Sequence, residues 1–219
     1  MNDAPSANDA GTDSTGDSIA DRRQHFPATE RNREPILAVL KRVLPETGFL
    51  LEIGAGSGQH AAYFAPRFPG LTWQPTEPDP INRASVAAWV EDTNTPNLRP
   101  PLDLDVTKDV WSLETSDVIY SANMIHIAPW ECCLGLMAGA GRILKENGLL
   151  VLYGPFMRGG EHTAPSNAQF DASLKSQNPA WGIRNLDHVT DVAQGCGLAL
   201  VETVDMPANN LTVIFNRQN

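Results

Sequence analysis

Three glycines, Gly54, Gly56 and Gly58, follow a short apolar run and constrain the fold more than any other part of the sequence. The run, residues 49–53, is typical of a buried parallel strand, and residues 59–68 carry apolar side chains at helical spacing. Glycine tolerates positive φ and lets a ligand approach the bare backbone. The order of strand, glycine turn and helix therefore predicts an α/β fold with a ligand site at the turn. A tight turn that binds no ligand is the alternative.

The residues around these glycines indicate which ligand the turn binds. A dinucleotide fingerprint requires its third glycine at the position of Gln59, so a nicotinamide-dependent oxidoreductase is disfavoured. An acid stands two positions before the first glycine, and the pattern E-x-G-x-G-x-G resembles the first motif of class I S-adenosylmethionine-dependent methyltransferases. The resemblance implies that the loop passes under the methionine and ribose of S-adenosylmethionine. The cofactor-binding residues predicted in this motif are Glu52, Gly54, Ala55, Gly56 and Gly58.

Length and composition fit one domain in a reducing compartment. The chain has 219 residues, 42% of them hydrophobic, and a formal net charge of −10. We expect no nucleic-acid partner because no basic face is visible, and no stretch approaches the length of a membrane span. The cysteines form no disulfide framework, which favours the cytoplasm, and no Cys/His spacing predicts a metal site. Residues 1–24 are predicted to be a disordered acidic tail, followed by the domain at residues 25–219.

An acidic residue follows the second predicted strand, residues 71–76. Glu77 stands at the spacing at which nucleotide-binding folds have a ribose-binding acid, and a carboxylate accepts hydrogen bonds from both ribose hydroxyls. Asp79 is the second candidate for this role. Helix capping before a helix at residues 81–91 is the alternative explanation of such an acid.

Residues 97–105 are predicted to be a third strand. It contains two adjacent prolines, which belong on the edge of a sheet. In the fold that the glycine motif resembles, an acid after this strand meets the adenine amino group. We assign that role to Asp105, with Val106 beside it in the cofactor site, and Asp103 is the alternative.

Two further strands, residues 117–122 and 149–153, carry polar groups to the same edge of the sheet. The carboxyl end of the first faces the ligand crevice at the switch point, so Asn123 is predicted to contact the cofactor. His126 is predicted to be a general base, with a hydrogen bond to the adjacent turn as the alternative. Tyr153 is predicted to orient the methyl acceptor, with core packing as the alternative.

A long connection, residues 157–184, is rich in Gly, Pro, Ser and Asn. Connections of this length inside a compact domain are usually lids or binding loops, so we expect a lid over the substrate. A helix near residues 168–175 has Asn167 and Asp171 on one face, four residues apart, and both are predicted to be catalytic. The elements expected after it are a helix at 186–194 and an antiparallel strand pair at 198–204 and 211–215.

The helix before the glycine motif has apolar residues at helical spacing from Ile36 to Leu44, and Pro35 suits its first turn. Arg31 and Asn32 lie in a polar stretch just before it. We predict that both contact the cofactor, and a solvated helix cap is the alternative.

Further motifs occur in order with the glycine motif, among them ERNREPIL, WQPTEPD, LDLDVT, NMIHIAPWEC and PAWGIRN. With them the chain resembles the methyltransferase-like 26 family from about Phe26 to Arg217. The resemblance implies an α/β, Rossmann-like three-layer sandwich of class I methyltransferases, with a seven-stranded, mostly parallel sheet of order 3-2-1-4-5-7-6 and strand 7 antiparallel. Glu77 departs from the aspartate usual in the family, but the longer acid still reaches both ribose hydroxyls.

The predicted function is transfer of a methyl group from S-adenosylmethionine to a small-molecule acceptor. A non-catalytic cofactor-binding or interaction protein is the alternative. The polar groups expected at the rim of the site weigh modestly for an enzyme, because a scaffold does not need them. The acceptor and the oligomeric state are left open by the sequence.

Overall fold

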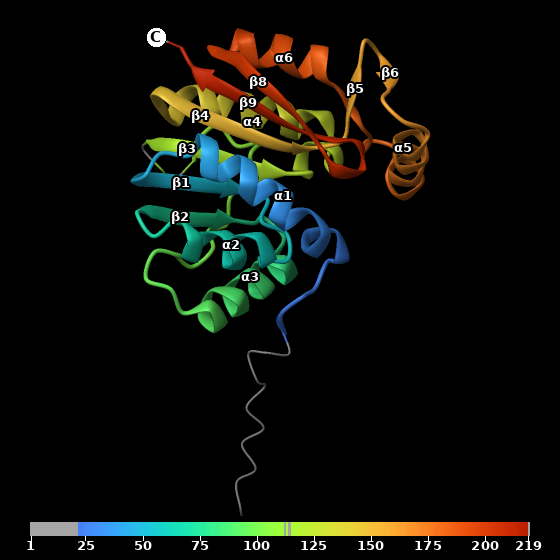
Figure 1. Ribbon diagram of the computed structural model, residues 1–219. Coiled ribbons are helices and arrows are strands. Elements are labelled where there is room, and N and C mark those ends of the chain that lie inside the picture. The colour runs from blue at the N-terminus through green and yellow to red at the C-terminus, as the bar shows by residue number, and fades with distance from the viewer. Residues whose placement is uncertain (1–21, 112, 114, 219) are drawn as a thin grey trace, which may run out of the picture.

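The computed structural model describes residues 22–111, 113 and 115–218. Six strands form one sheet in the order β2-β1-β3-β4-β9-β8, which is the central layer of the molecule (Figure 1). These strands are β1 (Gly48–Ile53), β2 (Leu71–Thr76), β3 (Ser116–Ala122), β4 (Leu144–Gly154), β8 (Leu198–Met206) and β9 (Asn210–Arg217).

Strands β1 to β4 run parallel, and β9 runs antiparallel to both β4 and β8. The antiparallel strand pair predicted at the end of the chain is therefore confirmed. Because β1, β2 and β3 are parallel neighbours, their carboxyl ends meet at one edge of the sheet. The pairing of β1 with β2 continues past the strand ends, since Ala55 N donates to Thr76 O at 2.9 Å.

Helices cover both faces of the sheet, so the expected three layers are present (Figure 1). Side chains alternate along β1, as a strand requires: Leu50 packs into the core beneath α1 and α2, and Leu51 packs into the core beneath α4 and α6. The helices of the first layer are α1 (Pro27–Val43), α2 (Gln59–Phe64), followed by the short helix η2 (Ala65–Arg67), and α3 (Pro80–Thr93). Those of the other layer are α4 (Trp130–Ile143), preceded by η3 (Met124–His126), and α6 (Leu186–Gly195).

The third strand predicted at residues 97–105 is not a regular strand, so the prediction of a seven-stranded sheet is wrong. The stretch pairs with β2 only through isolated parallel bridges at Leu98 and Leu102. The two adjacent prolines between these bridges have no backbone N–H to donate, which interrupts the ladder. The stretch nevertheless lies beside β2, where the predicted order puts it.

The long connection at residues 157–184 contains more regular structure than expected. A second sheet of order β6-β5-β7 is built from β5 (Phe156–Arg158), β6 (Glu161–His162) and β7 (Arg184–Asn185). Helix α5 (Pro165–Gln177) includes the helix predicted near residues 168–175, and α6 includes the one predicted at 186–194. A short helix, η4 (Pro207–Asn209), joins β8 to β9.

The first helix begins at Pro27 rather than at Pro35, which lies inside it. Arg31 and Asn32 are therefore residues of α1 and not of an approach to it. The apolar spacing starts only at Ile36, because the first turns of α1 extend past the sheet toward its carboxyl edge and the later turns cover the core.

The N-terminal boundary of the domain also differs from the predicted one. Most of the expected disordered tail, residues 1–21, lies outside the described residues. Gln24, which was assigned to that tail, is docked on α3: its backbone N donates to Ser85 Oγ at 2.8 Å, and its carbonyl accepts from Trp89 Nε1 at 3.1 Å. The domain therefore begins before residue 25.

Two findings concern membrane-spanning helices and metal-ligand clusters within the described residues. No helix there combines the length and the apolar character needed to cross a membrane. The same part of the chain holds no cluster of His, Cys, Asp and Glu side chains suited to a metal ion.

Gly139→Ala is expected to destabilise the fold, and Gly195→Ala is its matched control. A Cβ at Gly139 would lie 2.1 Å from a ring carbon of Trp111, whereas a Cβ at Gly195 meets nothing within 4 Å. Overpacking of this kind costs roughly 1–3 kcal/mol, and alanine in a helix is favoured over glycine by up to about 1 kcal/mol. Urea unfolding measures both effects. Equal stability of the two variants would contradict the packing of α4 against Trp111.

Candidate functional site

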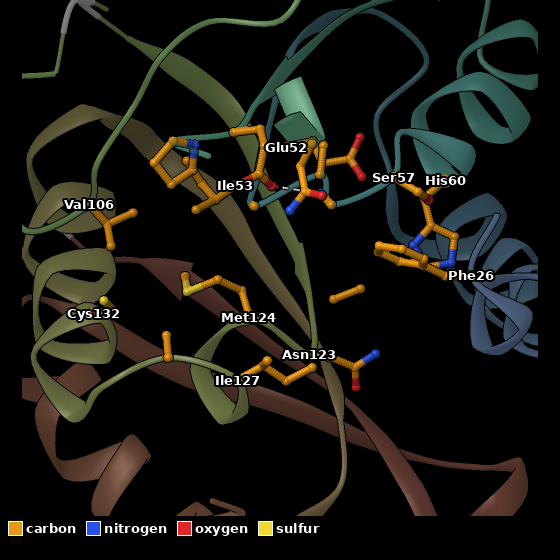
Figure 2. A pocket seen from close by; sticks show the side chains of 18 of the residues that line it. Phe26, Glu52, Ile53, Ser57, His60, Val106, Asn123, Met124, Ile127 and Cys132 are labelled. Atoms are coloured by element: carbon orange, nitrogen blue, oxygen red, sulfur yellow. Dashed lines mark hydrogen bonds between the residues drawn. The ribbon is translucent and has the colours of Figure 1, made fainter. Parts of the chain in front are cut away.

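A cavity of about 380 Å³ lies at the carboxyl ends of β1, β2 and β3. Its volume falls in the range of pockets that enclose small ligands. Figure 2 shows Val106 and Cys132 at one end, Phe26 and His60 at the other, and Glu52 with Ile53 between them. The structure thus brings together most of the residues predicted to bind the cofactor, namely Glu52, Gly54, Ala55, Gly56, Glu77, Asp105, Val106 and Asn123.

The glycine loop forms one wall of this cavity with bare backbone. Gly54 and Gly56 have φ of 67° and 58°, a region that side-chain-bearing residues rarely adopt. A Cβ at Gly54 would come within 2.8 Å of Met124 Cγ, so the close approach of the loop to η3 also requires glycine. Gly58 has a different role: it caps α2 with a φ of 91° and does not line the cavity.

Glu77 joins the glycine loop to the end of β2. Its Oε2 accepts from Gly56 N at 2.8 Å, and its Oε1 accepts from Asp79 N at 3.1 Å. Burial raises the pKa of Glu77, and these two backbone N–H groups oppose the shift. Asp79, the second candidate for the ribose role, instead caps α3 by accepting from the N–H groups of Ile81 and Asn82. Asp79 is therefore the helix cap, and Glu77 is the acid that lines the cavity.

Glu52 is an acid buried at the centre of the cavity wall. Its Oε2 accepts from Trp73 Nε1 at 2.7 Å, and the side chain is 2% exposed. Burial raises the pKa of Glu52 to about 8, the Trp73 hydrogen bond lowers it, and the charge of Glu77 raises it further. The carboxyl group is therefore largely protonated at neutral pH when no cation lies beside it.

The end of the cavity near Val106 is apolar with one acid at its margin. Leu104, Val106 and Cys132 supply the apolar surface, and Asp105 is the acid. Hydrogen bonds from the side chain and the backbone of Thr107 lower the pKa of Asp105, so it is ionised. The alternative acid, Asp103, forms an ion pair with Arg83 at 3.3 Å and does not line the cavity.

The opposite end contains His60 and Thr29, two residues that the sequence did not single out. His60 Nε2 lies 2.8 Å from Asn32 Oδ1, which joins α2 to α1. Burial lowers the pKa of His60 to about 3, so the ring is neutral at physiological pH. Thr29, also in α1, lines the cavity near this pair. The sequence offered one signal, since His60 follows the glycine motif directly, but its partner comes from a distant helix.

An N-terminal strap, residues 23–26, runs from α3 to α1 and reaches the cavity with Phe26. Phe26 N donates to Gln59 Oε1 at 2.5 Å, and the Phe26 ring lies over the glycine loop, 3.5 Å from where a Cβ of Gly56 would be. His25 and Arg23 both contact the Trp89 ring, and Arg23 also pairs with Asp92. The strap therefore contributes to the cavity wall through Phe26. The prediction of a disordered tail up to residue 24 did not include this role.

His126, predicted to be a general base, lies outside the cavity wall and is fully buried. Its Nδ1 accepts from Arg184 N at 3.2 Å, and its ring packs edge-to-face on Phe156 at 4.8 Å. Burial lowers the pKa of His126 to about 3. Its Nε2 has no partner among the described residues and lies close to Gly154, where a Cβ would be 2.6 Å away.

The other residues predicted to be catalytic also lie outside the cavity wall. Tyr153 packs in the core beneath α1, where burial raises its pKa. Asn167 donates from Nδ2 to Asn209 O at 3.0 Å, which joins α5 to the turn before β9. Asp171 accepts from Ile183 N at 2.8 Å and pairs with Lys175 at 2.5 Å. These contacts hold α5 in position.

Two further predictions concern residues near the cavity that do not line it. Arg31 is exposed on α1, and Asn32 faces His60 instead of the cavity. No residue of the predicted lid, residues 157–184, lines the cavity. The N-terminal segment instead contributes Phe26, Ala28 and Thr29 to the cavity wall.

Solved structures of several methyltransferases have the same fold. An O-methyltransferase family protein from Burkholderia thailandensis matches with a TM-score of 0.76 at 16% identity, over 88% of this chain and 58% of that one. A putative sarcosine dimethylglycine methyltransferase from Galdieria sulphuraria matches with a TM-score of 0.69 at 16% identity, over 87% of each chain. Human N-acetylserotonin methyltransferase, in complex with S-adenosylmethionine, matches at 0.71 and 14% identity, over 88% and 53%.

At these identities the likeness shows the fold, an α/β fold matching class I methyltransferases. The chain spans little more than half of two of these proteins, at 58% and 53% of their length. A family model described as "Protein of unknown function (DUF938)" matches residues 23–217, which begins within the strap and ends at the last residue of β9. The chain belongs to the DUF938 family.

Proposed function

We propose that the protein is an S-adenosylmethionine-dependent methyltransferase that acts on a small-molecule acceptor. One observation carries the proposal: the cavity wall combines bare glycine backbone with three acids, Glu52, Glu77 and Asp105, and has no Lys or Arg among its described residues. This lining suits a ligand with an ammonium and a sulfonium group. The same lining disfavours binding of a dinucleotide, because its pyrophosphate would meet carboxylates instead of cations.

The adenine, the ribose and the methionine ammonium of the cofactor each suit a different part of the cavity. The apolar end at Leu104 and Val106 suits an adenine ring, with Asp105 as the acceptor for its amino group. Glu77 suits the ribose, because each carboxylate oxygen that accepts a backbone N–H keeps a lone pair for a hydroxyl. Glu52 suits the methionine ammonium, which would favour its ionised form. Human N-acetylserotonin methyltransferase, which shares the fold and is in complex with S-adenosylmethionine, supports the choice of this cofactor.

The bound cofactor would supply an electrophilic methyl group, and this chain would supply the environment for its transfer. Displacement at a methyl carbon depends chiefly on holding the nucleophile in line and keeping water away. Glu52 and Ile53, both buried, form a part of the cavity wall that water does not reach from the protein side, and Phe26 of the strap lines the cavity beside the glycine loop. Transfer to a hydroxyl or amine also requires that the acceptor lose a proton.

A cofactor-binding protein without transferase activity is the second candidate. The observation that favours it is the position of His126, Asn167 and Asp171, which lie outside the cavity wall and form their hydrogen bonds with other parts of the chain. We propose that these residues have structural roles, which leaves the enzyme without the base that the sequence suggested.

Four finer expectations stay predictions: the family, the location, the lack of a nucleic-acid partner and the size of the acceptor. The resemblance to the methyltransferase-like 26 family is supported by the DUF938 match and the methyltransferase fold, but it goes further than either. A cytoplasmic location is proposed because the three cysteines are unpaired, and a nucleic-acid partner is not expected for so acidic a chain. The acceptor is proposed to be small because the cavity has a volume of only about 380 Å³.

Glu77→Gln is expected to weaken S-adenosylhomocysteine binding at least tenfold, from a dissociation constant in the micromolar range. The amide keeps one acceptor for Gly56 N but loses the charge, and hydrogen bonds to charged groups contribute about 1.5–3 kcal/mol. Calorimetry on the full chain measures the change. Asp103→Asn is the matched control, because it removes an acid just outside the cavity and should leave the affinity unchanged. Binding of NAD but not of S-adenosylhomocysteine would contradict the proposed cofactor.

Glu52→Gln is expected to change how the stability of the empty protein depends on pH. The folded pKa of about 8 lies above the unfolded value near 4.5, so the contribution of Glu52 is complete below pH 4.5 and is lost as the pH rises toward 8. The wild type should therefore lose up to about 1.4 kcal/mol per pH unit relative to Glu52→Gln across this window.

Urea unfolding at several pH values between 5 and 8.5 measures this difference. His60 and His126, whose pKa values are both lowered to about 3, give the opposite slope below pH 6.5. They are present in both proteins and cancel in the comparison. Parallel stability curves for the two proteins would show that Glu52 is not protonated in the empty site.

A further inference from the structure

The imidazole of His60 is held in one orientation at the cavity wall. It stacks on Phe64 with 5.1 Å between ring centroids and lies edge-to-face with Tyr120 at 6.3 Å. Nε2 lies 2.8 Å from Asn32 Oδ1. Three contacts from three elements thus fix a ring that is 7% exposed and lines the cavity.

These contacts leave one ring nitrogen available. With Asn32 Oδ1 as the acceptor, Nε2 carries the proton and Nδ1 carries the lone pair. Within the described residues, Nδ1 has no hydrogen-bond partner, and unlike Nε2 of His126 it is not closed off by protein atoms. An imidazole fixed in this way accepts a hydrogen bond at the cavity and donates none.

The position of His60 in the cavity indicates which bound molecule contacts it. Figure 2 shows His60 and Phe26 at the end opposite Val106 and Cys132, with Glu52 between them. If the adenine and ribose occupy the region from Val106 to Glu77 and the ammonium lies at Glu52, as proposed above, none of these three groups pairs with His60. The methyl acceptor is then the molecule that we assign to the His60 end of the cavity.

We propose that His60 binds and deprotonates the methyl acceptor, that Asn32 positions His60 for this role, and that the acceptor is an uncharged hydroxyl compound. This inference rests on the proposed function and names the substrate class for the same site. The lone pair of Nδ1 requires a donor such as O–H and repels a carboxylate or phosphate. The nearby acids, Glu52 and Glu77, disfavour anionic acceptors further, and Phe26, Thr29 and Met124 offer a largely apolar surface.

In the proposed transfer step, His60 takes up the proton that the acceptor hydroxyl loses. A lone pair of the acceptor oxygen forms the bond to the methyl carbon while the carbon–sulfur bond breaks and its electrons return to sulfur. The positive charge passes to the oxygen, and the hydroxyl proton moves along the existing hydrogen bond to His60 Nδ1. A protonated ether oxygen is a much stronger acid than an imidazolium, so the transfer is downhill even to a buried histidine. The imidazolium then releases its proton to water.

Two substitutions separate this role from a structural one. Glutamine keeps a donor near the position of Nε2, so His60→Gln retains the link to Asn32 but removes the acceptor at Nδ1. Asparagine has its carbonyl oxygen near the position of Nδ1, so His60→Asn retains an acceptor but loses the link. If His60 only joined α2 to α1, Gln would be the better replacement. If it binds the acceptor, Asn is the better one.

The test uses the full chain and a panel of simple phenols and aliphatic alcohols, with matched carboxylates as the comparison set. Binding of each compound to the protein saturated with S-adenosylhomocysteine is followed by ligand NMR, and methyl transfer by label from S-adenosylmethionine. We expect phenols or alcohols to bind and carboxylates not to bind. His60→Gln should lower turnover about 10²-fold or more, and His60→Asn should lose less.

Cofactor affinity separates this inference from the proposed function. S-adenosylhomocysteine binding should stay within threefold of wild type in both variants, and His188→Gln, at an exposed histidine on α6, should change nothing. Failure of the wild type to bind S-adenosylhomocysteine would overturn the proposed function. Normal cofactor binding with no hydroxyl compound bound or methylated, or with His60→Gln equal to wild type, would overturn only the role of His60.

Discussion

A hydrogen bond from Gly56 N to Glu77 Oε2, 2.8 Å long, joins the two strand ends on which the site depends. It is possible because β1 and β2 run parallel and in register, so that Thr76 O also receives Ala55 N just beyond the strands. The bond orients the glycine loop toward the cavity and fixes an acid beside it. The two helical layers cover both faces of the sheet that carries this edge.

Features encoded by neighbouring residues could be predicted from the sequence. The buried strands, the glycine turn and most helices each have a local pattern, and the prediction of parallel order brings their carboxyl ends together. Glu52, Glu77 and Asp105 were found in this way, because each stands at or just after a strand end. The prolines that interrupt the edge strand were also visible, but the sequence does not show how many bridges survive them.

Features that depend on distant contacts could not be predicted. His126 follows a strand end, yet its ring turns into the core against Phe156. Asn167 and Asp171 share a helix face as expected, but that face packs on the protein and not on a ligand. His60 was passed over because its partner lies on α1, and hydrogen bonding between helices leaves no periodic signal. The docking of Gln24 is of the same kind.

The strap has a consequence for how the cavity exchanges its contents. It is held by a few hydrogen bonds and by contacts with Trp89, whereas the sheet beneath it is held by continuous ladders. Opening the strap therefore requires far less free energy than unfolding the domain. The strap opens and closes in a local equilibrium that is separate from global unfolding. Substitutions in the strap can thus alter the residence time of a bound molecule while the thermal stability of the domain stays the same.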